Sequence, residues 1–275
     1  MARSAEENPD YEGTPTPVPS WVRPPRRKRT GAYKLMYQMS VFCLIHGSTQ
    51  NPSGWNLLAP ELESQGHQVI CPDLPVDKPE ASATYYAEAV TAALRESASP
   101  PIVVAHSVSG LFLPLVAKQR PVARMVFLAA TIPQVGKSAL QQLQSDPGMV
   151  CPEWIGKDPT KDARLAMKFL FHDCSPEVAH WALSTLRLMY AQGALTEICP
   201  SDLWPDVPSS YVLCREDRTL NPNWWRVACR ERLGFDPIEV DSGHCPHISR
   251  PAELADLLSR MANPSYGSSR ISRHR

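Results

Sequence analysis

Short runs of consecutive apolar residues alternate along this chain with segments whose apolar residues recur every three or four positions. The runs are typical of strands buried on both faces, and the recurring pattern is typical of amphipathic helices. The runs predict strands over residues 41–45, 68–71, 102–105, 124–130, 210–214 and 237–240. The recurring pattern predicts helices over residues 55–65, 84–96, 222–232 and 251–261, and a further helix that begins at Ser107. This alternation indicates an α/β fold with a mostly parallel sheet and helices on both faces.

The alternation is interrupted once, in the second half of the chain. Residues 134–205 have helical spacing and contain no predicted strand, and the pair Ser175-Pro176 is typical of a helix start. The alternation of strands and helices then resumes at residue 210. We therefore predict one domain over residues 40–262, with a helical cap inserted at about 134–205.

Both ends of the chain lack this pattern. Residues 1–39 hold six prolines and the basic run 26–29, and residues 263–275 hold three arginines and no acidic residue. Segments of this composition bury too little apolar surface to offset the entropy lost on ordering. We predict that both are disordered basic tails. The basic run is typical of a nuclear-localisation or phosphate-binding patch. The alternatives are a solvated charged tail, or a sequence that begins too early because the true start codon encodes Met36 or Met39.

The charge balance of the predicted domain narrows the set of partners. Residues 40–262 carry 18 basic and 24 acidic side chains, so no nucleic-acid-binding face is expected. The sequence shows no secretory segment at its start and no apolar run of about 18 residues, so we expect no membrane insertion and a cytoplasmic location. The eight cysteines are scattered without a C-x-x-C pair and are expected to be reduced. A homodimer is a possible assembly.

Ser107 stands where a predicted strand turns sharply into a predicted helix. A serine there directs its hydroxyl toward the positive end of the helix, where backbone N–H groups can hold a developing negative charge. Nucleophiles in such turns usually have the form G-x-S-x-G, and here the two glycine places hold Ala105 and Ser109, which are both small. Ser107 is therefore a candidate nucleophile. The competing interpretation is a serine that only begins a helix.

Two further chemical groups follow predicted strands. Asp217 comes after the strand at 210–214, and His244 comes after the strand at 237–240. Because the carboxyl ends of parallel strands lie at one edge of the sheet, we expect Ser107, Asp217 and His244 to meet there. His244 would remove the proton of Ser107, and Asp217 would hold the imidazole in the required tautomer and stabilise its cation.

The loop after the first strand and the residue after Ser107 predict an oxyanion hole. Its donors would be the backbone N–H groups of Ser48 and Val108. Two alternatives stay open at this point. Glu216 is adjacent to Asp217 and could be the acid, and the stretch His244-Cys-Pro-His247, with other cysteines nearby, could suggest a zinc site. Two side chains at one strand end supply too few ligands for zinc, so no metal and no other cofactor is expected.

The remaining histidines are interpreted as structural. His46 is expected to bond the backbone of its own loop, and His106 is expected to pack beneath the turn that carries the serine. His67, His172 and His180 are expected at helix ends or on the surface of the cap.

Several stretches belong together as a set of landmarks. They are Phe42-Cys-Leu-Ile-His-Gly47, Trp55-Asn-Leu-Leu-Ala-Pro-Glu-Leu-Glu63, Cys71-Pro-Asp-Leu-Pro75, Ala105-His-Ser-Val-Ser-Gly110 and Gly243-His-Cys-Pro-His-Ile-Ser249. With them, residues 41–262 resemble the α/β-hydrolase superfamily, and more narrowly the branch of plant methylesterases, hydroxynitrile lyases and their bacterial relatives. The resemblance implies Ser107 as nucleophile, His244 as base, Asp217 rather than Glu216 as its orienting acid, and a buried acyl pocket beneath the cap.

Two residues of this chain differ from those of the hydroxynitrile lyases in that branch, and they favour ester hydrolysis. Its hydroxynitrile lyases carry a threonine directly after the histidine of the oxyanion loop and a lysine directly after the catalytic histidine, whereas this chain has Gly47 and Cys245. A cyanohydrin lyase needs a cation near the leaving cyanide, which Cys245 does not supply. We therefore predict a serine hydrolase that cleaves a small, mostly apolar carboxylic ester through an acyl-enzyme. The alternatives are a hydrolase-fold receptor that binds a small molecule with little turnover and, disfavoured by Cys245, a hydroxynitrile lyase.

Overall fold

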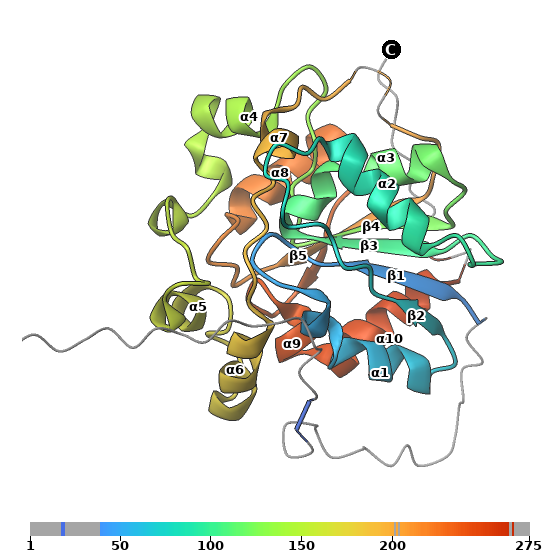
Figure 1. Cartoon of the computed structure of the whole chain (residues 1–275), viewed down its shortest axis with the longest axis horizontal. Helices are drawn as coiled ribbons and strands as arrows, with labels where there is room; N and C mark the ends of the chain where they lie inside the picture. The colour runs from blue at the N-terminus through green and yellow to red at the C-terminus, as the bar shows by residue number, and fades with distance from the viewer. Residues whose placement is uncertain (1–17, 20–38, 201, 203, 264–265, 267–275) are drawn as a thin grey trace, which may run out of the picture.

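One parallel sheet organises the structure, which is a computed structural model that describes residues 18–19, 39–200, 202, 204–263 and 266. Within these residues six strands pair in the order β2-β1-β3-β4-β5-β6, all parallel (Figure 1). The strands are β1 (Val41–Ile45), β2 (Gln68–Ile70), β3 (Ile102–His106), β4 (Arg124–Leu128), β5 (Ser209–Cys214) and β6 (Ile238–Val240). Each predicted strand is present, with small differences at its ends.

Helices cover both faces of this sheet. The α-helices are α1 (Leu58–Ser64), α2 (Ala83–Ala93), α3 (Leu113–Gln119), α4 (Ala139–Ser145), α5 (Ala163–Phe169), α6 (Pro176–Ala182), α7 (Gln192–Thr196), α8 (Pro222–Leu233), α9 (Pro246–Ser249) and α10 (Pro251–Met261). Helices α1 and α10 lie on one face, and α2, α3 and α8 lie on the other (Figure 1). The predicted α/β architecture is confirmed.

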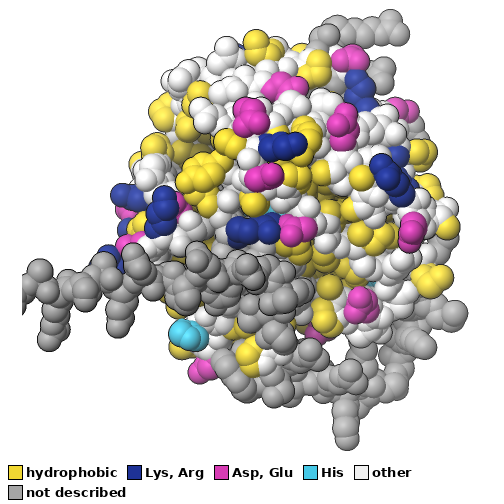
Figure 2. Space-filling model, in the orientation of Figure 1, with side chains coloured by type: hydrophobic (Ala, Val, Ile, Leu, Met, Phe, Trp, Pro, Cys, Tyr) yellow, Lys and Arg dark blue, Asp and Glu magenta, His cyan; other side chains and the backbone are white. Residues whose placement is uncertain are grey.

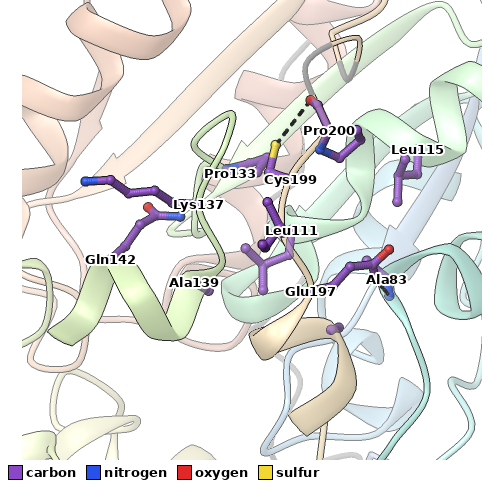
Figure 3. A pocket seen from close by; sticks show the side chains of 12 residues that line it. Ala83, Leu111, Leu115, Pro133, Lys137, Ala139, Gln142, Glu197, Cys199 and Pro200 are labelled. Carbon is purple, nitrogen blue, oxygen red and sulfur yellow. Dashed lines mark hydrogen bonds between the residues drawn. The ribbon is translucent and has the colours of Figure 1, made fainter. Parts of the chain in front are cut away.

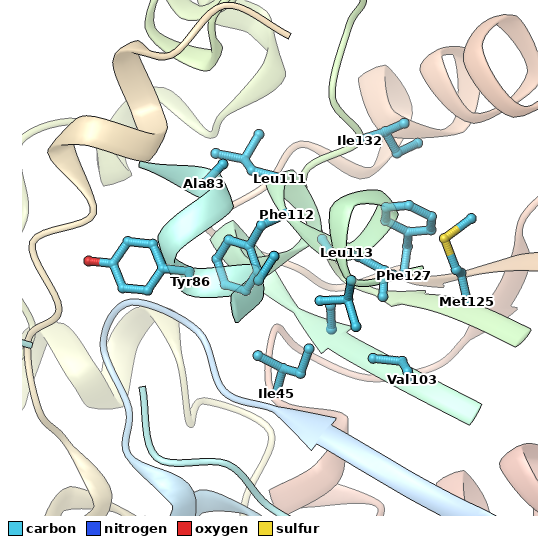
Figure 4. Packing of buried hydrophobic residues seen from close by; sticks show 14 of the residues in the cluster. Ile45, Ala83, Tyr86, Val103, Leu111, Phe112, Leu113, Met125, Phe127 and Ile132 are labelled. Carbon is cyan, nitrogen blue, oxygen red and sulfur yellow. The ribbon is translucent and has the colours of Figure 1, made fainter. Parts of the chain in front are cut away.

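The central strands are buried on both faces because their side chains alternate between two apolar clusters. In β1, Cys43 and Ile45 join the cluster beneath α2 and α3, whereas Phe42 and Leu44 join the cluster beneath α1 and α10. Figure 4 shows the first of these clusters, in which aromatic rings from several elements pack together. A continuous apolar run is therefore required in these strands, and the sequence pattern reflects it.

Two predicted helices begin later than the apolar spacing indicates. Short 3-10 turns (Pro52–Trp55 and Ser107–Leu111) precede α1 and α3, and the first turns of these helices contain Pro60 and Pro114. Proline has no N–H and its ring clashes with the carbonyl four residues earlier, so an α-helix cannot run through it unbroken from upstream. Each helix therefore starts afresh near its proline.

The segment between β4 and β5 contains α4, α5, α6 and α7, and no strand is present among its described residues. It also contains the 3-10 turns Pro147–Met149, Pro152–Trp154 and Leu183–Thr185. Helix α6 begins as predicted, because the Ser175 side chain accepts a hydrogen bond from the Val178 N–H and Pro176 occupies the first helical position. A third apolar cluster joins this segment to the body of the fold, with Phe171 and Trp181 packed near Leu57. We call residues 134–205 the inserted segment.

The predicted disordered tails, residues 1–39 and 263–275, fall almost entirely outside the described residues, so their disorder stays a prediction. Two described residues within them do have contacts. Val18 is buried against the third apolar cluster, and the carbonyl oxygen of Tyr266 accepts a hydrogen bond from the buried Arg124 at 2.7 Å. Each end of the chain therefore has a described residue in contact with the domain.

The described surface carries mixed charges, and the cysteines form no disulfide bonds. On the face shown in Figure 2, acidic and basic side chains are interspersed with apolar ones. All eight cysteines are free. In the described part of the chain, no helix has the length and the apolar character that crossing a membrane requires.

The apolar layer beneath α2 and α3 is expected to supply much of the stability. Leu113 on α3 is fully buried, whereas Leu140 on α4 is 41% exposed. Leu113→Ala should lower the free energy of unfolding by about 2–5 kcal/mol, because a cavity replaces packed atoms. Leu140→Ala, the matched control, should change it by at most about 0.5 kcal/mol. Urea unfolding followed by circular dichroism measures both, and similar losses in the two variants would contradict this placement of the core.

Candidate active site

The order of the strands brings two loops together at one edge of the sheet. The chain passes from β1 to β2 on one side, and β3 then pairs with β1 on the other side. In open α/β sheets, ligands bind at such a reversal, outside the carboxyl ends of the strands. The loop after β1 and the turn after β3 meet here, because a Cβ added to Gly47 would lie 2.9 Å from the Cβ of Ser107. Only glycine fits at position 47 without displacing its neighbours.

Ser107 has a strained backbone conformation. Its φ is +58°, in the left-handed region that residues with a Cβ seldom adopt. The segment that follows β4 holds it there, because the Thr131 N–H donates to the Ser107 carbonyl at 3.0 Å. Glycine is also required at position 110, where a Cβ would overlap the Thr131 carbonyl oxygen. Strain of this kind persists only where the surroundings enforce it, and it is common at active sites.

Ser109 replaces the second glycine of the usual turn and contributes a hydrogen bond of its own. Its hydroxyl donates to the His46 carbonyl at 2.5 Å, which ties the turn to the loop after β1. The His46 ring bonds the Gly47 carbonyl at 2.9 Å and accepts from the Leu74 N–H at 3.1 Å. His46 is thus the structural residue that the sequence predicts.

Asp217 and His244 form a buried hydrogen-bonded pair. His244 Nδ1 lies 2.7 Å from Asp217 Oδ2, and the two residues are 3% and 7% exposed, respectively. The Asp217 Oδ1 atom accepts from the Thr219 N–H at 2.7 Å and from the Leu220 N–H at 3.0 Å. Glu216 is exposed, so Asp217 and not Glu216 is the partner of His244.

His106 connects the serine turn to the base. Its Nε2 lies 2.9 Å from the His244 carbonyl oxygen, and the two ring centroids are 4.6 Å apart. Among the described residues the Ser107 hydroxyl makes no hydrogen bond to His244. Such bonds are often long in unliganded enzymes and tighten with substrate. His106, the residue before Ser107, therefore links the serine turn to the loop that carries His244.

Two histidines beside His244 are held neutral. Burial, followed by the neighbouring histidines, keeps the pKa of His106 well below its ordinary value. Burial and then His244 lower the pKa of His247 to about 3. His244 consequently faces uncharged rings on this side. His67 lies just after the end of α1, where the sequence allows a helix-end position, and it is buried with its ring 5.0 Å from that of Phe42.

The inserted segment bonds both loops that carry the pair, and the sequence did not indicate this. His172 Nε2 lies 3.0 Å from the carbonyl oxygen of Glu216, the residue before Asp217. Asp173 Oδ2 accepts at 2.9 Å from the N–H of Gly243, the residue before His244. We call these two contacts the loop clip.

Thr219 is another residue that the sequence analysis missed, and its hydroxyl contacts both Asp217 and His244. Its signal was the spacing Asp-x-Thr after a strand, which is typical of a local side-chain turn.

A small open pocket lies elsewhere, between α2, α3, α4 and α7 (Figure 3). Its lining includes Leu111, Lys137, Gln142 and Cys199, and none of the predicted site residues. The acyl pocket that the sequence predicts beneath the cap stays a prediction. In the described residues, no group of three or more His, Cys, Asp or Glu side chains is arranged to hold a metal ion.

Residues 43–257 match the Alpha/beta hydrolase family, and the chain belongs to this family. Similar proteins include an alpha/beta hydrolase, nvfD, of Aspergillus novofumigatus, which is 25% identical over 82% of this chain and 95% of the relative. Methylesterase 7 of Arabidopsis thaliana is 26% identical over 81% of this chain and 96% of its own. The crystal structure of polyneuridine aldehyde esterase superposes with a TM-score of 0.66 at 20% identity, over 82% of this chain and 100% of that one. Relatives named as hydrolases and esterases support a carboxylic ester hydrolase.

The neutral state of His247 predicts a pH dependence of stability. An unfolded histidine binds a proton below its ordinary pKa of 6.5, whereas folded His247 stays neutral down to about 3. Between these values the unfolded state binds more protons, so stability falls as pH falls. His247→Gln should reduce this slope by up to about 1.4 kcal/mol per pH unit. The exposed His180→Gln should leave it unchanged. Urea unfolding at pH 7, 6 and 5 gives the slopes, and equal slopes in wild type and His247→Gln would show that His247 is protonated in the folded state.

Proposed function

We propose that this chain is a serine hydrolase that cleaves a small, mostly apolar carboxylic ester through an acyl-enzyme intermediate. Ser107 is the nucleophile, His244 is the general base and then the general acid, and Asp217 orients the imidazole. The observation that carries the proposal is the buried bond of 2.7 Å between Asp217 and His244, at the edge of the sheet where Ser107 occupies a left-handed turn. An acid, a base and a strained serine at one sheet edge are the components of acyl transfer.

The pair determines which nitrogen of His244 acts. An ionised carboxylate accepts and cannot donate, so the imidazole carries its proton on Nδ1 toward Asp217 and leaves Nε2 free. Nε2 removes the Ser107 proton while Oγ attacks the ester carbonyl carbon. The tetrahedral intermediate then expels the alcohol, which takes that proton from Nε2. A water molecule repeats the sequence on the acyl-enzyme, releasing the carboxylic acid and restoring the Ser107 hydroxyl.

The backbone N–H groups of Ser48 and Val108 are the proposed oxyanion donors. Val108 lies in the first turn of a 3-10 helix, where N–H groups have no partner within the helix. The Ser48 loop is held in place because its carbonyl accepts from the Met189 N–H at 2.7 Å. Removal of one such donor typically slows catalysis by about 10²–10³-fold.

The apolar substrate class is supported by the neighbours of these loops. Met189, whose N–H bonds the Ser48 carbonyl, is buried. Val108 is partly buried and packs against the apolar cluster beneath α2 and α3. Relatives named methylesterase and polyneuridine aldehyde esterase support an ester as the substrate. The lyase alternative needs a cation after His244, whereas Cys245 is fully buried and its burial raises the pKa of the thiol well above the ordinary value.

Replacement of the nucleophile separates an enzyme from a binding protein. Ser107→Ala should lower the hydrolysis of p-nitrophenyl esters by at least about 10³-fold and abolish labelling by a fluorophosphonate probe. Ser64→Ala, which changes an exposed serine on α1, should match wild type in both assays. A panel of rising acyl length also measures substrate preference. The receptor alternative would be supported if wild type and Ser107→Ala were equally slow on every ester and Ser107 stayed unlabelled.

Substitution of the two neighbouring carboxylates, Asp217 and Glu216, tests which of them is the acid. Asp217→Asn should lower kcat by about 10³–10⁴-fold, because an amide can stabilise the wrong imidazole tautomer. Glu216→Gln changes an exposed side chain and should stay within about 3-fold of wild type. Steady-state kinetics on p-nitrophenyl butyrate, with circular dichroism to check folding, make the comparison. The reverse ranking of the two variants would assign the role to Glu216.

A further inference from the structure

We propose that Thr219 is a positioning residue of this site, whose hydroxyl shares the Nδ1 proton of His244 with Asp217. The inference rests on the proposed function, since it concerns how the base is held for attack by Ser107. Thr219 Oγ1 lies 2.8 Å from His244 Nδ1 and 2.9 Å from Asp217 Oδ1. The side chain thus contacts both members of the buried pair at once.

The position of Thr219 is fixed independently of these contacts. The residue is 1% exposed, and its own N–H donates to Asp217 Oδ1 at 2.7 Å. Its carbonyl accepts from the Cys151 N–H at 2.8 Å, so the inserted segment holds it from the other side. A hydroxyl on so constrained a backbone has few orientations and loses little entropy on bonding.

Counting protons gives the direction of each hydrogen bond. The hydroxyl of Thr219 has one hydrogen and two lone pairs, and an ionised Asp217 can only accept. The hydroxyl hydrogen therefore goes to Asp217 Oδ1, and a lone pair of Oγ1 faces His244. The Nδ1–H of His244 then lies between two acceptors, Oδ2 at 2.7 Å and Oγ1 at 2.8 Å.

This arrangement differs from support by a carboxylate alone. A single acceptor permits the ring to tilt about one hydrogen bond, whereas two acceptors on either side of one N–H restrict it. Removing the hydroxyl leaves Asp217 Oδ1 with the N–H groups of Thr219 and Leu220, so the loop keeps its anchors. The imidazole, by contrast, loses one of its two acceptors. The cost is therefore expected in the chemical step, where a small error in geometry is expensive.

The test compares Thr219→Val, which removes the hydroxyl at nearly constant volume, with Thr219→Ser, which keeps it. Thr219→Val should lower kcat on p-nitrophenyl butyrate by about 10–100-fold with KM within about 3-fold, and Thr219→Ser should stay within about 3-fold in kcat. The control is Thr91→Val on α2, because its hydroxyl also makes two bonds, at 2.8 and 2.9 Å. It should match wild type. The rate of fluorophosphonate labelling of Ser107 should follow kcat.

A spectroscopic measurement reads the shared proton without turnover. The His244 Nδ1–H should give a low-field proton resonance that disappears in His244→Ala. It should shift in Thr219→Val and return to its position in Thr219→Ser. Should Thr219→Val fail to fold by circular dichroism, Thr219→Ala with the same readouts replaces it.

Either of two results would overturn the proposal. One is a folded Thr219→Val variant whose kcat stays within about 2-fold of wild type. The other is a His244 Nδ1–H resonance that does not shift in that variant. A third result separates it from the proposed function. Wild type that hydrolyses no ester and leaves Ser107 unlabelled refutes the hydrolase, and the resonance then decides by itself whether Thr219 shares the proton.

Discussion

The burial of one carboxylate is the constraint on which the rest of the site depends. An ionised group removed from water costs several kcal/mol unless it is paired and hydrogen-bonded. Asp217 meets this requirement with two backbone N–H groups, the Thr219 hydroxyl and the His244 imidazole. Three of these donors belong to the loop after β5, and His244 belongs to the loop after β6. The buried carboxylate therefore ties the two loops together.

The serine turn shows a second constraint, in which strain is balanced by close packing. Ser107 is held with φ at +58° by the segment after β4, in which Ala129 has φ at +42° and Thr131 bonds the serine carbonyl. Gly47 and Gly110 permit the approach of the loops on either side. Ser109 adds a hydrogen bond that a glycine at that place could not make. A serine at position 109 has less backbone freedom than the usual glycine. Its hydroxyl, however, bonds the loop after β1, which helps to hold the turn in place.

The sequence predicted those features that depend on local pattern. Continuous apolar runs identified all six strands because strands such as β1 are buried on both faces, and Ser175-Pro176 marked a helix start correctly. Two of the side chains predicted to meet at the strand ends, Asp217 and His244, are in contact. The sequence failed where a partner is distant in the chain. The burial of His67 was not predicted, because its ring partners, Phe42 and α10, are not visible from its neighbours. The loop clip was missed for the same reason, whereas Thr219 was missed although its spacing from Asp217 is a local signal.

The loop clip bears on how this fold can be altered. Caps of hydrolases invite exchange between relatives, since they are contiguous insertions between two strands. Here His172 and Asp173 bond the residues that precede the acid and the base, and Cys151 bonds Thr219. The inserted segment thus also braces the two loops that carry Asp217 and His244. A chimera that replaces the whole segment would remove these contacts, whereas a graft that retains residues 151 and 172–173 would keep them.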